Sequence, residues 1–210
     1  LNRIGIFDKN ADEIIEKITS KGSKVILQLA SLDERYMALI VSVIMKKLLN
    51  YSTKMNTQKR VRGVESSIAP RIWTIIDEAH VICPKNQKTI ASMPVIEYVK
   101  RGRDSGLSLV IATQQPSAID TDLISQHDIS IVHRLSMESD INSAISKMPT
   151  RKPVLKKGNL PSERPLSIED IVRDSQDGTS IISDAESSRG FMILSRPRVV
   201  FHGGGEPEIE

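Results

Sequence analysis

The octet W-T-I-I-D-E-A-H at residues 73–80 constrains the fold of this chain more than any other stretch. Four apolar or β-favouring residues run directly into two neighbouring carboxylates, Asp77 and Glu78. A run this short and apolar is typical of a strand that is buried on both faces of a parallel sheet. Ionisable groups at its end then lie at the carboxyl edge of the sheet, where open α/β sheets bind ligands. The octet therefore predicts an α/β fold with a polar site at that edge.

Two acidic side chains at this edge can divide the work of nucleotide hydrolysis. Asp77 would hold Mg²⁺ through water and Glu78 would polarise an attacking water, which is the Walker B arrangement of nucleotide hydrolases. The alternative interpretation is a strand followed by an acidic helix N-terminus, where the helix dipole favours Asp and Glu.

Other segments alternate between strand and helix patterns. Short apolar runs predict strands at residues 25–29, 107–112 and 129–135. Helical spacing of apolar residues covers residues 11–20, 32–50, 94–101 and 137–148, and shorter helices are predicted at 121–126 and 167–175. Such alternation predicts a mostly parallel sheet with helices on its faces. Residues 51–70 are polar and basic and predict a solvated loop, with a DNA contact as the alternative. Residues 178–183 and 190–196 predict a β-hairpin.

A second polar segment follows the strand predicted at 107–112. Thr113 and Gln114 come directly after it, so we expect them at the same edge as Asp77 and Glu78. A glutamine there can orient water or sense a γ-phosphate. The alternative is that these residues only end the strand, which Pro116 closes.

The phosphate-binding half of a nucleotide site is absent from the sequence. No G-x-x-x-x-G-K-[ST] segment occurs, and Gly22-Ser23-Lys24 lacks the first glycine and the loop length. A Walker B strand without such a cradle is half a site. We expect the first half of the domain to lie upstream of Leu1; the alternative is a degenerate domain.

Composition limits the remaining classes. Hydrophobic residues make up 39% and charged residues 26%, the balance of an ordinary globular protein, and the net charge of +3 permits nucleic-acid binding without requiring it. The single cysteine, Cys83, excludes an internal disulfide and a multi-cysteine metal site and suits a reducing cytoplasm. No apolar run approaches ~20 residues, so we expect no membrane partner.

Six motifs occur in a fixed order that resembles a known family. They are I-I-D-E-A-H at 75–80, G-R-D-S-G-L at 102–107, A-T-Q-Q-P-S at 112–117, I-S-Q at 124–126, V-H-R-L at 132–135 and G-T-S-I-I-S at 178–183. Together they resemble the C-terminal half of the motor domain of a HerA-type ATPase, in the HerA/FtsK clade of hexameric DNA pumps. The resemblance covers about residues 22–200.

The resemblance implies a fold and a domain organisation. The fold would be a RecA-like P-loop NTPase core, truncated before the Walker A segment, with a C-terminal β-hairpin. Residues 1–148 would form the partial ATPase domain, residues 149–177 a basic, proline-rich linker with a short helix, and residues 178–210 the hairpin and tail.

The resemblance also implies an activity. It is ATP-driven translocation of double-stranded DNA by a hexameric ring, with ATP and Mg²⁺ as cofactors; in archaea such proteins act with the NurA nuclease in resecting DNA ends. Asp77 would help to hold Mg²⁺, Glu78 would be the catalytic base, and Thr113 and Gln114 would meet the nucleotide, Gln114 as the sensor.

Arg103 matches the family's arginine finger. It stands between a predicted helix and a predicted strand, so we expect it near the surface, where its cation can stabilise the charge that grows on a neighbouring subunit's γ-phosphate. The alternative is a helix C-terminal cation stabilised by the dipole.

DNA contacts are expected from the loop after the Walker B strand. In RecA-like folds this loop can face the pore, which singles out Lys85 and Lys88. Aromatic residues are only 3% of the chain, so base stacking on single strands is poorly supplied and phosphate contacts on a duplex suit the composition better. His80 is expected to pack under the Walker B strand without a metal, and Cys83 to be a buried hydrophobe.

Three rival interpretations stay open. A DEAH-box helicase would need a second RecA-like domain, for which too few residues follow Gln115. A conjugation-type coupling ATPase is closer in pattern. A non-catalytic, degenerate ATPase-fold adaptor belongs to a different class, and a P-loop upstream of Leu1 would argue against it.

Overall fold

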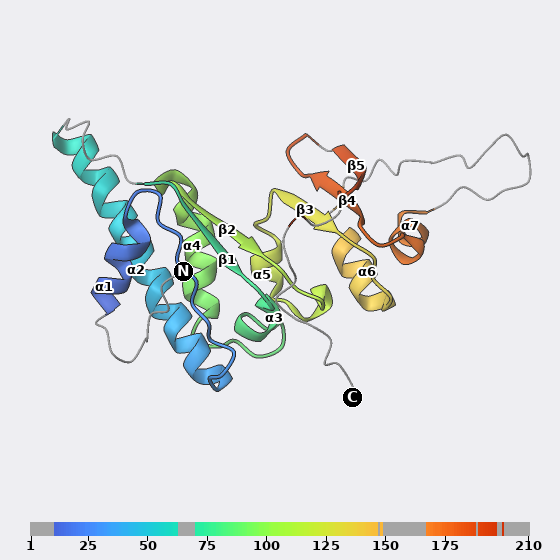
Figure 1. Cartoon of the computed structure of the whole chain (residues 1–210), viewed down its shortest axis with the longest axis horizontal. Coiled ribbons are helices and arrows are strands. Elements are labelled where there is room, and N and C mark those ends of the chain that lie inside the picture. Colours follow the sequence, from blue (N-terminus) through green and yellow to red (C-terminus); the bar gives the residue numbers. More distant parts are fainter. Residues whose placement is uncertain are drawn as a thin grey trace, which may run out of the picture. The chain divides into compact units, whose positions relative to one another are not determined.

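The computed structural model describes residues 11–62, 70–146, 148, 167–187, 189–196 and 199. The chain divides into two compact units, residues 1–127 and 128–210. Each unit has its own β-sheet and its own hydrophobic cluster (Figure 1).

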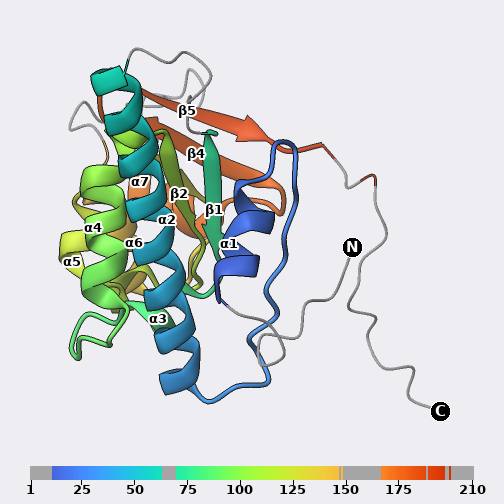
Figure 2. The same cartoon turned by 90° about the vertical axis from the view of Figure 1, so that its left-hand side faces the viewer.

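The first unit consists of a parallel pair of strands and the helices that cover one face of it. Its elements are α1 (Ala11–Thr19), α2 (Glu34–Arg62), β1 (Ile72–Ile76), α3 (Ala79–Ile82), α4 (Ser92–Gly102), the 3-10 turn η2 (Arg103–Ser105), β2 (Leu107–Ile111), the 3-10 turn η3 (Pro116–Ala118) and α5 (Thr121–Ile124). β1 and β2 run parallel, with Ile72 opposite Leu107 and Ile76 opposite Ile111. Figure 2 shows α2 and α4 on the same side of this sheet.

The core lies between the sheet and these helices. Ile72 and Ile76 of β1 are buried against α2 and α4. Tyr98 of α4 is 1% exposed, and its hydroxyl lies 2.8 Å from Thr74 Oγ1 of β1. This polar contact inside an apolar layer fixes the register of α4 on the strand that leads to Asp77.

The prediction that β1 is buried on both faces is wrong. Trp73 and Ile75 point away from the helices, and 70% and 71% of their surfaces are exposed. Side chains alternate between the two faces of a strand, and the described elements cover only the face that carries Ile72, Thr74 and Ile76.

The predicted buried strand at residues 25–29 is also wrong. The segment has no strand pairing among the described residues, and its side chains alternate between exposed and half-buried. Leu27 and Leu29 pack against the core, whereas Ile26 is 65% exposed. The apolar run is therefore explained by one-sided packing of an extended segment rather than by a place inside the sheet.

The predicted loop at 51–70 is wrong over its first twelve residues, because α2 continues to Arg62 and is 29 residues long. This part is rich in Lys, Met, Gln and Arg, which are good helix formers. It is also held by tertiary contacts: Ser52 is fully buried, and the Asn56 side-chain amide donates to Asp104 O at 3.3 Å. Residues 63–69 lie outside the described part of the chain.

The second unit is an antiparallel sheet with two helices. Its elements are β3 (Ile129–Val132), α6 (Glu138–Ile145), α7 (Ile168–Asp174), β4 (Thr179–Asp184) and β5 (Arg189–Leu194). β4 and β5 form the predicted hairpin, which is confirmed. β3 pairs antiparallel with β4, whereas the alternation of strands and helices placed it in the parallel sheet. Ser167 and Asp170 cap α7 reciprocally, as their spacing predicted.

The predicted division at residues 148 and 177 stays a prediction. Residues 149–166, the main part of the proposed linker, lie outside the described residues. In the part of the chain that is described, no helix combines the length and apolar character needed to cross a membrane.

Candidate active site

The two predicted polar segments meet at one edge of the parallel sheet. β1 ends at Ile76 and β2 ends at Ile111, directly opposite each other. The pairing continues past the strands, because Ala112 N–H donates to Ile76 O at 2.9 Å and Ala79 N–H donates to Ala112 O at 3.0 Å. Glu78 and Gln114 therefore follow the same, carboxyl edge of the sheet.

Glu78 has an unusual backbone conformation. Its φ of 47° and ψ of 49° lie in the left-handed region, and it is the one non-glycine residue with positive φ in the described ranges. A single residue costs roughly 1–2 kcal/mol in this conformation. Its own N–H donates to Asp77 Oδ1 at 3.0 Å. The turn starts α3 immediately after the strand and directs the Glu78 side chain toward His80 instead of along the sheet.

His80 connects the acidic segment to the second strand. Its Nδ1 lies 3.0 Å from Thr113 Oγ1 and 3.3 Å from Glu78 Oε2. Thr113 Oγ1 also accepts from Gln115 N–H at 3.0 Å. The expectation that His80 packs under the strand missed both contacts. The only signal in the sequence is its position two residues after Glu78.

The loop after α3 is tied to the loop after β2 by backbone hydrogen bonds. Asp120 N–H donates to Cys83 O at 2.9 Å, and Lys85 N–H donates to Ala118 O at 2.8 Å. Pro84 and Ile119 form an isolated antiparallel bridge. The two loops that follow the predicted Walker B and sensor segments therefore behave as one structural element.

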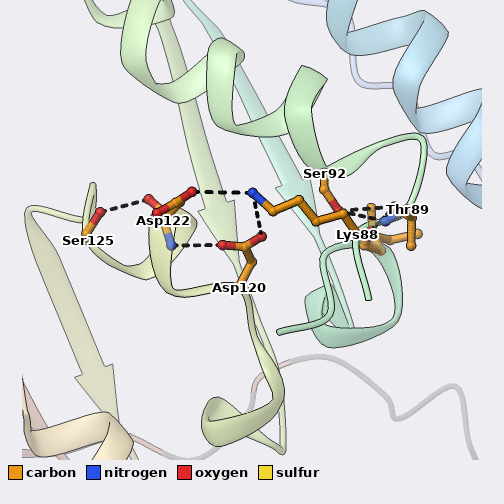
Figure 3. Close-up of polar contacts among 7 residues, drawn as sticks. Lys88, Thr89, Ser92, Asp120, Asp122 and Ser125 are labelled. Carbon is orange, nitrogen blue, oxygen red and sulfur yellow. Dashed lines mark hydrogen bonds and ion pairs between the residues drawn. The ribbon is translucent and has the colours of Figure 1, made fainter. Parts of the chain in front are cut away.

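Lys88 reinforces this connection (Figure 3). Its Nζ lies 3.5 Å from Asp122 Oδ2 and 4.0 Å from Asp120 Oδ2. The Asp120 carboxylate is 5% exposed and also caps α5, since its Oδ1 accepts from Asp122 N–H at 2.8 Å. Lys88 balances two carboxylates, which opposes the predicted use of its charge on DNA phosphates. Lys85 has an exposed side chain, and its contact with DNA stays a prediction.

Cys83 is buried among these loops. It is 1% exposed, and desolvation, helped by the nearby Asp120 charge, raises the pKa of its thiol to about 12. A thiol in that state is a poor nucleophile, in agreement with its predicted role as a small buried hydrophobe.

Arg103 lies away from the other predicted site residues. It is exposed, at the start of η2, and precedes the amino end of β2. The five residues of β2 span roughly 3.3 Å each, so Arg103 stands at the opposite edge of the sheet from Asp77. It does not join Glu78 and Gln114 at the carboxyl edge, and its role as an arginine finger stays a prediction.

The acidic segment is suited to a hydrated Mg²⁺ rather than to a metal held by protein alone. Among the described residues no group of three His, Cys, Asp or Glu side chains could hold a metal ion. Mg²⁺ at nucleotide sites keeps several waters and takes one or two carboxylates together with phosphate oxygens. The exposed Asp77 fits that mode, and bound Mg²⁺ would neutralise phosphate charge there.

No protein-family profile matches the chain, but individual proteins do. It is 32% identical over 135 residues to the DNA double-strand break repair helicase HerA of Sulfurisphaera tokodaii. It is 27% identical over 135 residues to the protein of that name from Saccharolobus solfataricus. Each alignment covers 64% of this chain and 26% of the relative, so the chain spans about a quarter of the length of the curated relatives it matches.

Solved structures share the fold. The genome packaging NTPase B204 from Sulfolobus turreted icosahedral virus 2, in complex with AMPPCP, has a TM-score of 0.55 at 17% identity, over 88% of this chain and 72% of that chain. The bacterial conjugative coupling protein TrwB has a TM-score of 0.51 at 13% identity, over 78% and 37%. The predicted P-loop NTPase fold and the predicted resemblance to HerA-type proteins are both confirmed.

Proposed function

We propose that this chain, whose sequence makes it a relative of the HerA helicases, is part of an ATP-driven motor that moves double-stranded DNA through a ring of subunits. It would act in DNA end resection with a NurA-type nuclease. ATP and Mg²⁺ would be its cofactors. The observation that carries the proposal is the shared carboxyl edge. There the Asp77–Glu78 segment and the Thr113–Gln114 segment follow neighbouring parallel strands, in a fold shared with a genome packaging NTPase and a conjugative coupling protein.

The side chains at this edge supply the groups that ATP hydrolysis needs on the side of the attacking water. Glu78 accepts a proton from the attacking water, and Gln114, exposed at the end of β2, orients that water or contacts the γ-phosphate. Asp77 would hold Mg²⁺ through water, and the bound ion would neutralise phosphate charge. Phosphoryl transfer depends mainly on positioning and on charge stabilisation, so a rigid edge that aims these groups is the main contribution of this part of the protein.

The first experiment replaces the proposed base. In the full-length protein that carries this chain, Glu78→Gln should abolish ATP turnover and leave ATP binding intact, because the amide keeps the shape and cannot take a proton. Glu97→Gln, an exposed glutamate on α4, is the matched control and should retain turnover. Equal hydrolysis by wild type and Glu78→Gln would remove the assignment and favour the non-catalytic adaptor.

The second experiment tests whether Arg103 serves a neighbouring subunit. Glu78→Gln and Arg103→Ala subunits, each inactive alone, should regain part of the activity when mixed, because some interfaces then combine an intact base with an intact arginine. Arg101→Ala, an exposed arginine two residues earlier, is the control and should be active alone. Mixed rings that assemble and stay inactive would contradict a finger supplied in trans.

A further inference from the structure

One oxygen of the proposed base is buried without a hydrogen bond. Glu78 Oε2 is inaccessible to solvent and has no hydrogen-bond partner among the described residues. Its polar neighbour is His80 Nδ1 at 3.3 Å, a contact that lacks hydrogen-bond geometry. Buried carboxylate oxygens are expensive to leave unpaired. The Glu78 carboxylate therefore lies close to a possible donor, His80 Nδ1, without forming a hydrogen bond to it.

The same imidazole nitrogen reaches the sensor side of the site. Nδ1 lies 3.0 Å from Thr113 Oγ1, whose second contact is the N–H of Gln115. The His80 side chain is 20% exposed, and Ala79 beside it is buried with its N–H bonded to Ala112. The backbone next to His80 is thus fixed, and its imidazole lies near two oxygens. These are Glu78 Oε2, which follows β1, and Thr113 Oγ1, which follows β2.

We propose that His80 is a positioning residue that couples the Thr113–Gln114 segment to Glu78. Its Nδ1 can form a hydrogen bond with Thr113 Oγ1 or with Glu78 Oε2. A shift of Thr113 on nucleotide binding would therefore change which of the two is bonded and how firmly the Glu78 carboxylate is positioned. The left-handed backbone at Glu78 makes this coupling local, because the Glu78 carboxylate then lies 3.3 Å from Nδ1 of His80, only two residues later. The inference rests on the proposed function of Glu78.

The test compares three substitutions of His80 by steady-state ATP hydrolysis in the full-length protein. His80→Ala should lower kcat on the order of tenfold to a hundredfold, because a misplacement of about 1 Å in a catalytic group can cost about a hundredfold in rate. KM for ATP should change less than about twofold. His80→Asn places an amide nitrogen near the Nδ1 position and should restore much of kcat. His80→Gln places its amide near Nε2 and should not.

Thr113→Val provides a second, independent variant. Valine keeps the branched shape and removes the hydroxyl, so kcat should fall, and the double variant with His80→Ala should lose little more than either single variant. Circular dichroism and ATP binding verify that each variant folds and binds nucleotide.

The outcomes separate this inference from the proposed function. If Glu78→Gln is inactive while His80→Ala keeps wild-type kcat, or if Asn restores no more than Gln, the coupling role is refuted and the base assignment stands. If Glu78→Gln retains turnover, both fail together. Loss of kcat with Asn rescue and a non-additive double variant supports the coupling.

Discussion

The contact between Tyr98 and Thr74 can be measured by a double-mutant cycle. Tyr98→Phe removes the hydroxyl on α4, and Thr74→Val removes its partner on β1 while keeping a branched side chain suited to a strand. The two hydroxyls lie 2.8 Å apart between the sheet and the helix. The cycle therefore reports on the connection between the strand that carries the acidic segment and the helix that leads to Arg103.

Burial sets the expected magnitudes. Tyr98 is 1% exposed whereas Thr74 is half-buried. Thr74→Val leaves the buried phenol hydroxyl of Tyr98 without a partner and should cost about 1–3 kcal/mol of unfolding free energy. Tyr98→Phe should cost less, about 0.5–1.5 kcal/mol, because water can still reach the hydroxyl of Thr74. The double variant leaves no unpaired group, so it should cost about 1 kcal/mol less than the sum of the single variants.

Urea denaturation followed by circular dichroism at 222 nm is the assay. Most of the described helical residues belong to the first unit, chiefly to α2 and α4, so the helical signal reports mainly on the unfolding of that unit. Tyr36→Phe is the matched control, because Tyr36 is 60% exposed and its change should stay within about 0.5 kcal/mol. Additive losses in the double variant, or a larger loss for Tyr98→Phe than for Thr74→Val, would refute the reasoning.

Two further predictions concern the same unit. Gly102→Ala should cost about 1–3 kcal/mol in overpacking, because an added Cβ would lie 2.9 Å from Leu107 Cβ. A gain of about 1 kcal/mol in helix propensity offsets part of this, so the net destabilisation in urea unfolding should be up to about 2 kcal/mol. Cys83 should react with an aromatic disulfide reagent at pH 8 about a thousandfold more slowly than an unfolded thiol, because its pKa is about 12 rather than 9.0. The same raised pKa means that the unfolded chain loses the thiol proton first, so the unfolding free energy should fall as pH rises above 9.0 and should fall less in Cys83→Ala.

Sequence patterns were sufficient where the determining interactions are local. The cap of α7 follows from Ser167 and Asp170 three residues apart, and the hairpin follows from two alternating runs around a turn. The shared edge of Asp77 and Gln114 needed only one further assumption, that β1 and β2 are parallel. In each case the residues that decide the structure lie within the pattern itself.

The patterns failed where distant contacts decide. The run at 25–29 has the composition of a strand, but strand formation depends on an available partner edge, which the run itself does not encode. The polar end of α2 has no continuous apolar face, yet it stays helical with Ser52 buried and Asn56 bonded to Asp104, 48 residues away. β3 has strand propensity, but its partner, β4, is specified by residues about fifty positions later.

The conformation of Glu78 belongs to the second kind, and it is the part of the site that matters most to the proposed chemistry. A pattern of apolar residues followed by two acids gives no reason for a left-handed backbone at the second acid. The reason lies in Ala79, which is buried and whose N–H bonds to Ala112 on the neighbouring strand extension. That hydrogen bond turns the backbone toward the extension of β2 one residue after Glu78. The hydrogen bond from Glu78 N–H to Asp77 Oδ1 is compatible with this turn. The orientation of Glu78 is thus set by the extension of β2, the strand that precedes Gln114. His80 adds contacts to Glu78 and to Thr113.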